Sequence, residues 1–201
     1  MKKFKVGKIF NKLIPKITSK SRPIKNSVSI LFPSRLNAMA MDSSRIAIRT
    51  DKIYTAGEVV FSVGLYIKVF IKIRKDNKVI ISDTSERKSI ILHATILMQK
   101  ALKIKNGFNI DVVNNKEIKH IGLGSSSGLI ATVASAINFL YGSPVSSQSL
   151  VRYLAQNHGE EILGNNNYLF PVQCLGGSAA AGLFSDGMIL ISGENTVIAS
   201  S

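Results

Sequence analysis

The chain has 201 residues, 45% of them hydrophobic, which suits one globular domain with a full core. No apolar run is long enough to span a bilayer, and the single cysteine excludes an internal disulfide or a cysteine-based zinc site. The lone cysteine agrees with a reducing, cytoplasmic location, and the three histidines lie far apart in the sequence.

The formal net charge of +14 is concentrated near the N-terminus, where residues 1–26 hold nine basic residues and no acidic one. Their apolar residues fall on one helical face interrupted by Gly7 and Pro15, which predicts a basic amphipathic arm. Such an arm suits an anionic membrane surface, a targeting presequence or nucleic acid. A solvated or partner-packed extension is the favoured interpretation. Nucleic acid is disfavoured because the chain lacks the interleaved aromatic and basic residues of single-strand binders.

Extended segments follow the arm. Ser27–Phe32 predicts a strand that ends at Pro33. Glu58–Val63 and Tyr66–Ile73 are rich in β-branched and aromatic residues, and a turn then leads to a short strand at Val79–Ile81. The pattern predicts paired antiparallel strands with one solvent-exposed face.

Helices and strands alternate in the rest of the chain. Glu86 lies three residues after Asp83 and suits a capping box, while Glu160 and Glu161 lie near the end of a later predicted helix. Strands before and between helices predict an α+β fold with helices on one side of the sheet. The predicted elements are a helix from about Asp83 to Leu102, a strand at Phe108–Val113, a helix from Ser147 to about Leu163, and a last strand at Met188–Ile191.

The glycine- and serine-rich stretch His120–Gly128 runs directly into an apolar-periodic segment that predicts a helix over residues 125–140. A helix N-terminus preceded by glycines binds anions through its free N–H groups and its dipole, so a phosphate cradle is the favoured interpretation. The stretch lacks the lysine of a Walker loop. A dinucleotide-binding fingerprint comes second because the acidic residue expected about 20 positions on is missing. An ordinary loop and N-cap ahead of a buried helix stays open beside these functional interpretations.

Several motifs together resemble those of the GHMP kinases, the superfamily of galactokinase, homoserine kinase, mevalonate kinase and phosphomevalonate kinase. Gly122-Leu123-Gly124-Ser125-Ser126-Ser127 resembles the G-L-G-S-S motif, and Pro33–Asn37 is similar to the first motif, P-x-R-[IV]-N. Glu160–Gly164, with the later Gly176-Gly177, resembles the branch that includes heptose phosphate kinases. The likeness covers roughly residues 28–193. It implies a ribosomal S5 domain 2-like two-layer sandwich, with a mixed or antiparallel sheet and helices on one side.

The resemblance implies an ATP-dependent small-molecule kinase that transfers the γ-phosphate of ATP to a hydroxyl of a metabolite, with a sugar or sugar phosphate as the expected acceptor. Ser126 and Glu160 would bind Mg²⁺, with Glu161 as the alternative acid. The acceptor would contact Arg35, Asn37 and Asp42, and Asp42 is also the candidate catalytic residue. The nucleotide would be bound by Gly122, Leu123, Gly124, Ser125, Ser126 and Ser127.

The chain departs from this family in two respects. Family members with a general base carry an aspartate before the paired glycines, whereas Tyr168–Gln173 holds no acid, although some members transfer phosphate by positioning and charge stabilisation alone. We also expect residues 27–201 to form only the ATP-binding domain, which makes a separate C-terminal kinase domain a candidate partner. A catalytically reduced nucleotide-binding relative or half-enzyme is therefore the alternative, and a basic nucleic-acid or membrane-surface module is a further one.

Overall fold

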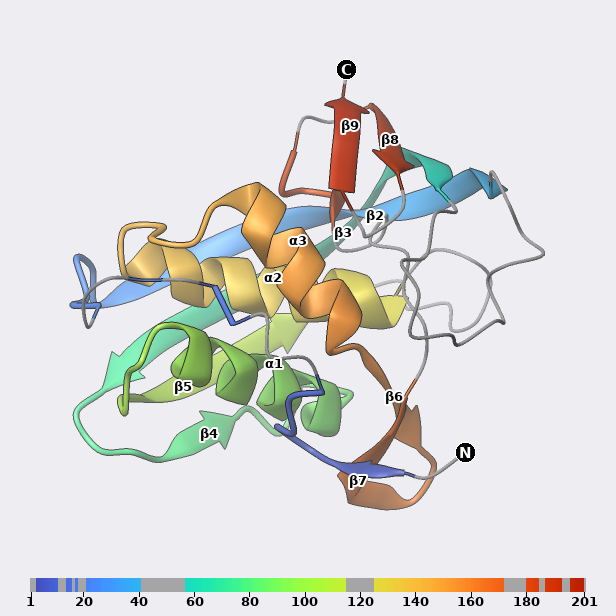
Figure 1. Ribbon diagram of the computed structural model, residues 1–201. Helices are drawn as coiled ribbons and strands as arrows, with labels where there is room; N and C mark the ends of the chain where they lie inside the picture. The colour runs from blue at the N-terminus through green and yellow to red at the C-terminus, as the bar shows by residue number, and fades with distance from the viewer. Residues whose placement is uncertain are drawn as a thin grey trace.

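A six-stranded sheet carries three helices on one face, and a three-stranded sheet lies at one end of the molecule (Figure 1). The computed structural model describes residues 3–10, 14, 15, 17, 21–40, 57–114, 125–171, 180–184, 187–192 and 196–200. The α+β prediction with helices on one side is confirmed. The elements are β1 (Phe4–Lys5), β2 (Ser27–Ala40), β3 (Glu58–Arg74), β4 (Val79–Ile81), α1 (Lys88–Ala101), β5 (Gly107–Val113), α2 (Ser125–Leu140), α3 (Ser147–Gln156), β6 (Gly159–Ile162), β7 (Asn165–Pro171), β8 (Met188–Ser192) and β9 (Thr196–Ser200).

Strand β3 is the centre of the larger sheet. Ile67, Val69 and Ile71 are buried under the helices, and the residues between them are exposed on the other face. Strand β2 pairs with one edge of β3, while β5 and β8 share the other edge at its two ends. The expected alternation between a buried and a solvent-exposed face is confirmed in this part of β3.

Three strand predictions are wrong. Strand β2 continues through Pro33, which is tolerated because β2 pairs with no described strand besides β3 and its register shifts between Pro33 and Ser34. The two segments expected around residues 58–63 and 66–73 form one continuous strand, β3. Strand β4 pairs in parallel with β5, which lies between β4 and β3, so the sheet is mixed.

Helix α1 begins at Lys88, five residues later than predicted. The preceding loop is held by β5, because the Ser85 hydroxyl accepts the Val112 N–H at 2.8 Å. Asp83 forms an ion pair with Lys88 at 2.7 Å on the protein surface. Arg87 then takes the left-handed conformation, with φ 56° and ψ 43°, at the N-cap position. The capping box predicted from Asp83 and Glu86 is therefore wrong, since the N-cap is Arg87 and has no side-chain cap.

Helix α3 ends at Gln156, so the prediction of a helix to about Leu163 is wrong. Asn157 terminates it: its side-chain amide donates to the Tyr153 carbonyl at 2.8 Å, and its own carbonyl lies 2.7 Å from His93 Nε2. The chain then becomes extended as β6 and turns back as β7. Glu160 and Glu161 consequently lie on a strand and not on a helix.

The described residues 3–10 of the basic arm pack against the domain. Strand β1 pairs with β7, and Phe4 is only 3% exposed. The Gly7 N–H donates to His93 Nδ1 at 2.9 Å, and Lys100 Nζ donates to the Gly7 carbonyl. The helical face predicted for this part of the arm is therefore wrong, because long-range strand pairing determines its conformation.

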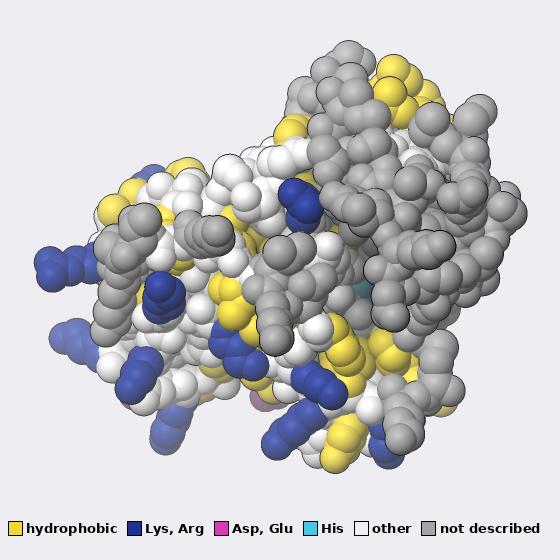
Figure 2. Space-filling model, viewed as in Figure 1, with side chains coloured by type: hydrophobic (Ala, Val, Ile, Leu, Met, Phe, Trp, Pro, Cys, Tyr) yellow, Lys and Arg dark blue, Asp and Glu magenta, His cyan; other side chains and the backbone are white. Residues whose placement is uncertain are grey.

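The face that shows α1 is basic (Figure 2). Lys and Arg side chains are spread over it, and few acidic side chains are visible. Exposed lysines from the arm and from the region around the end of α1 include Lys5, Lys8, Lys100, Lys103 and Lys105. Within the described residues, no helix combines the length and apolar character needed to cross a membrane.

Candidate functional site

The predicted helix over residues 125–140 is confirmed as α2, and three serines form its first turn. Because the first N–H groups of a helix point out of its N-terminal end, this turn is a potential anion-binding site strengthened by the helix dipole. Ser126 and Ser127 are each 7% exposed. Gly122, Leu123 and Gly124 lie outside the described residues, and their contact with phosphate stays a prediction.

Arg87 joins the start of α1 to two carboxylates on β6. Its Nη2 lies 2.5 Å from Glu160 Oε1, and its Nε lies 2.8 Å from Glu161 Oε2. The Arg87 side chain is 4% exposed, whereas the two glutamate side chains are 24% and 27% exposed. A buried guanidinium thus compensates two partly buried carboxylates through charge-assisted hydrogen bonds, leaving this group with a formal charge of −1.

Arg87, Glu160 and Glu161 form a polar cluster with the first serines of α2. Arg87 donates to Ser126 Oγ at 2.6 Å and to Ser125 Oγ at 3.2 Å. The Ser126 hydroxyl in turn donates to Glu160 Oε1 at 2.6 Å. Glu161 accepts a further hydrogen bond from Ser89 at 2.9 Å. The starts of both long helices are therefore connected to β6 through one hydrogen-bond network.

The backbone of Arg87 is strained. Its left-handed conformation costs roughly 1–2 kcal/mol for a residue with a Cβ, and its ion pairs and hydrogen bonds offset this strain.

His158 lies close to the Glu160 carboxylate. Its Nε2 lies 3.8 Å from Glu160 Oε2. Burial lowers the pKa of His158, and the charge of Glu160 opposes this effect only in part. His158 is therefore neutral at pH 7 and adds no positive charge.

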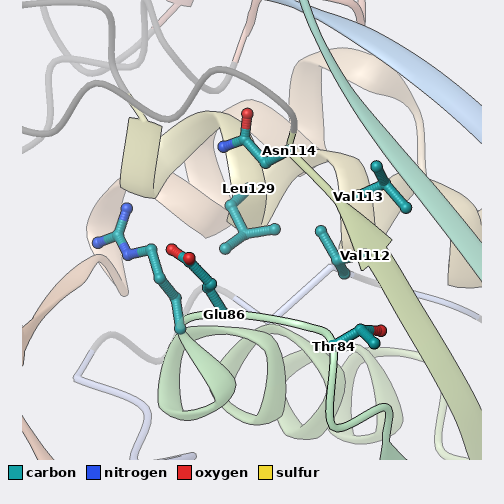
Figure 3. Close-up of a pocket in the computed structure, with 7 residues that line it drawn as sticks. Thr84, Glu86, Val112, Val113, Asn114 and Leu129 are labelled. Carbon is teal, nitrogen blue, oxygen red and sulfur yellow. The ribbon is translucent and has the colours of Figure 1, made fainter.

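A pocket lies beside this cluster, between the loop before α1, the end of β5 and the start of α2 (Figure 3). It contains about 600 Å³ of empty space, part of it open to solvent. Val112 and Leu129 supply apolar surface, and Glu86 and Asn114 supply polar groups on opposite sides (Figure 3). Arg87 lines both the pocket and the cluster, so the two form one continuous candidate site.

Comparison with known proteins shows what part of the chain resembles. Residues 89–177, which include α2, β6 and all of α1 but its first residue, match the family model described as the GHMP kinases N terminal domain. The resemblance to the GHMP kinases is thus confirmed over this part of the chain. Similar solved structures include homoserine kinase from Cytophaga hutchinsonii (17% identity, TM-score 0.59), D-glycero-D-manno-heptose 1-phosphate kinase from Bacteroides thetaiotaomicron (17% identity, TM-score 0.62) and L. major mevalonate kinase in complex with R-mevalonate (14% identity, TM-score 0.58).

The same comparisons define the extent of the likeness. The three structures are matched over 84%, 87% and 85% of this chain but over 49%, 59% and 51% of their own chains. The chain thus spans about half the length of these GHMP kinases, and it has their ribosomal S5 domain 2-like fold. None of the curated proteins matches it in sequence.

The structure brings some of the sequence-predicted site residues together. Ser126 and Glu160 are in direct hydrogen-bond contact, and their binding of a metal ion stays a prediction. Asn37, on β2, donates to Glu58 Oε2 at 2.9 Å, and Arg35 lies on the same strand. Asp42 lies outside the described residues. The roles predicted for Arg35, Asn37 and Asp42 toward an acceptor stay predictions.

Three further members of the network were missed from the sequence: Arg87, Ser89 and His158. An arginine in the left-handed conformation has no sequence signature, because that conformation favours glycine and asparagine. Arg87 and Ser89 come close to Glu160 and Glu161 only through packing of α1 against β6. None of the motifs that resemble those of the GHMP kinases contains Arg87, so they did not indicate it.

Proposed function

We propose that the chain is the nucleotide-binding half of an ATP-dependent small-molecule kinase of GHMP type, which transfers the γ-phosphate of ATP to a hydroxyl of a metabolite. The observation that carries this proposal is the direct contact between Ser126, in the first turn of α2, and the Glu160 carboxylate. An anion-binding helix start and a carboxylate beside it are the two elements that a magnesium-nucleotide complex needs.

The oxygen atoms of Ser126 and Glu160 suit Mg²⁺ as a ligand pair. Ser126 and Glu160 supply oxygen atoms, which this ion prefers, 2.6 Å apart. The described residues contain no group of three or more His, Cys, Asp or Glu side chains that could hold a metal by themselves. Phosphate oxygens and water would therefore complete the coordination, as is usual for magnesium in phosphoryl-transfer sites. When bound, the ion would neutralise charge on the transferring phosphate.

The pocket beside the cluster suits the nucleobase of ATP. Val112 and Leu129 offer apolar contact to a flat ring, and Thr84, Glu86 and Asn114 offer polar groups at its edge. Because Arg87 lines both the pocket and the cluster, one nucleotide could reach from the apolar surface to the serines of α2. The base and the phosphates would then be positioned by different elements of the same layer.

The acceptor side of the proposal rests on β2. Arg35, Asn37 and Asp42 would bind a sugar or sugar phosphate, with Asp42 as the candidate catalytic residue. A separate C-terminal kinase domain is the proposed partner, since the chain spans about half of the matched structures, and a cytoplasmic location belongs to the same proposal. A nucleotide-binding relative without phosphoryl transfer is the second candidate, favoured by the lack of an acid in Tyr168–Gln173.

Calorimetry with Mg-ATP tests nucleotide binding directly. We expect Ser126→Ala to weaken the affinity roughly tenfold or more, because a hydrogen bond to a charged group contributes about 1.5–3 kcal/mol. Ser135→Ala is the matched control: the same change in the same helix, at another buried serine. Equal affinities in the two variants would contradict the proposal. Turnover measured with sugars, sugar phosphates, homoserine and mevalonate then separates a kinase from a relative that only binds.

A further inference from the structure

Arg87 contacts the same two oxygen atoms that the proposed function assigns to the divalent cation. Its Nη2 donates to Glu160 Oε1 at 2.5 Å and to Ser126 Oγ at 2.6 Å. A magnesium ion would bind its oxygen ligands at about 2.0–2.1 Å. The guanidinium and the ion therefore could not contact this pair of oxygens together without placing two positive charges in direct proximity.

We propose that Arg87 is a built-in competitor of the divalent cation, an inference that rests on the proposed function. Its guanidinium contacts Glu160 and Ser126, and it would leave these atoms when the cation binds. Arg87 is thus a residue that sets the affinity for the cation.

Glu161 gives Arg87 a second anchor. It accepts from Arg87 Nε at 2.8 Å, and its other oxygen is held by the Ser89 hydroxyl at 2.9 Å. The guanidinium can therefore release Glu160 and keep one carboxylate partner. Since it also donates to Ser125 at the start of α2, it would remain where the nucleotide phosphates are proposed to bind. Phosphate would then favour the released arginine, so nucleotide and cation would increase each other's affinity.

Mn²⁺ binding without nucleotide tests the competition, with electron paramagnetic resonance of the free ion as the readout. The decisive variant is the double change Arg87→Met with Glu161→Gln. It removes one positive and one negative charge, so the formal charge of the cluster stays at −1 while Glu160 and Ser126 are unchanged. It also avoids leaving two carboxylates without a cation, which protects the fold more than Arg87→Met alone.

We expect the double variant to bind Mn²⁺ roughly tenfold more tightly than the unmodified chain, because Glu160 and Ser126 no longer have to give up their hydrogen bonds to Arg87 before they bind the ion. One such charge-assisted bond contributes about as much free energy as a tenfold change in affinity. Glu161→Gln alone should bind more weakly than the unmodified chain, since Arg87 then loses its second described carboxylate anchor and holds Glu160 more strongly. Arg74→Met is the matched control: it removes an arginine paired with Asp76, outside this cluster, and should leave the affinity unchanged.

The outcomes separate the inference from the function beneath it. Equal or weaker Mn²⁺ binding by the double variant, with retained circular dichroism, would overturn the competition and make Arg87 a residue that positions Glu160. Loss of Mn²⁺ binding in Glu160→Gln is expected if the ion binds at this site. If no variant binds Mn²⁺ while Mg-ATP still binds, the competition is overturned and nucleotide binding stands. If neither ligand binds, the proposed function fails as well.

Discussion

Gly159 lies directly before the two carboxylates on β6, and adding a methyl group to it is the sharpest test of how the N-terminal strand supports the site. A Cβ at this position would lie 2.4 Å from Phe4 Cζ and 3.0 Å from Leu169 Cβ. Its φ is not in the left-handed region, so the backbone itself accepts alanine. Gly159→Ala therefore creates a steric conflict with Phe4 and little backbone strain.

The size of the effect follows from the burial of Phe4, which is 3% exposed. Displacing this ring would lose part of the roughly 1.5–3 kcal/mol that burial of a phenylalanine contributes. Keeping the ring in place would force an overpacked contact of about 1–3 kcal/mol. By either route we expect Gly159→Ala to lower the free energy of unfolding by about 2 kcal/mol.

A double-mutant cycle of Gly159→Ala and Phe4→Leu, measured by urea unfolding, isolates the steric conflict between the added Cβ and Phe4. Leucine lacks the Cζ atom that the Cβ would meet. In the Phe4→Leu background, we expect Gly159→Ala to lower the unfolding free energy by only about 1 kcal/mol or less, with the remaining contact made by Leu169. Gly64→Ala is the control, since among the described residues its Cβ would meet only Tyr66, at 4.0 Å. An equal effect of Gly159→Ala in both backgrounds would refute the packing argument.

Three further predictions concern the layers around the site. Burial lowers the pKa of His93 below its usual 6.5, so the unfolded chain binds its proton first as the pH falls, and the urea midpoint should decrease below pH 6.5; a profile as steep in His93→Gln would contradict this. Tyr153→Phe leaves the Leu97 carbonyl without its 3.0 Å buried donor and should lower the unfolding free energy by about 1–2 kcal/mol, with an unchanged urea midpoint as the contrary result. Ser146→Ala removes the N-cap of α3 and should lower it by about 1 kcal/mol, measured in the same way, whereas Ser147→Ala should have little effect.

Local sequence patterns were sufficient where local interactions determine the structure. Helix α2 has the predicted bounds because its apolar residues repeat with helical spacing over residues 125–140 and Gly142 follows in a left-handed turn. The alternation along β3 likewise indicated which face is buried. The glycine and serine motif indicated the resemblance to the GHMP kinases and singled out Ser126.

The other half of the site depends on contacts between distant segments. The helix predicted up to Leu163 stops earlier because Asn157 bonds to His93, which lies 64 residues away. Glu160 was named as a site residue, but on the wrong kind of element. Arg87 could not be found at all, since only the folded chain places its guanidinium between β6 and α2.

The pairing of β1 with β7 also has a consequence for the order in which the protein folds. Phe4 is opposite Leu169, so this pairing closes a loop of about 165 residues, whereas β6 and β7 form a hairpin with a short connection. Closing the longer loop costs more chain entropy, and long-range pairings form slowly. We therefore expect the β6–β7 hairpin to form early and to remain mobile until the N-terminal strand docks, so the carboxylates reach their final positions in one of the last steps of folding.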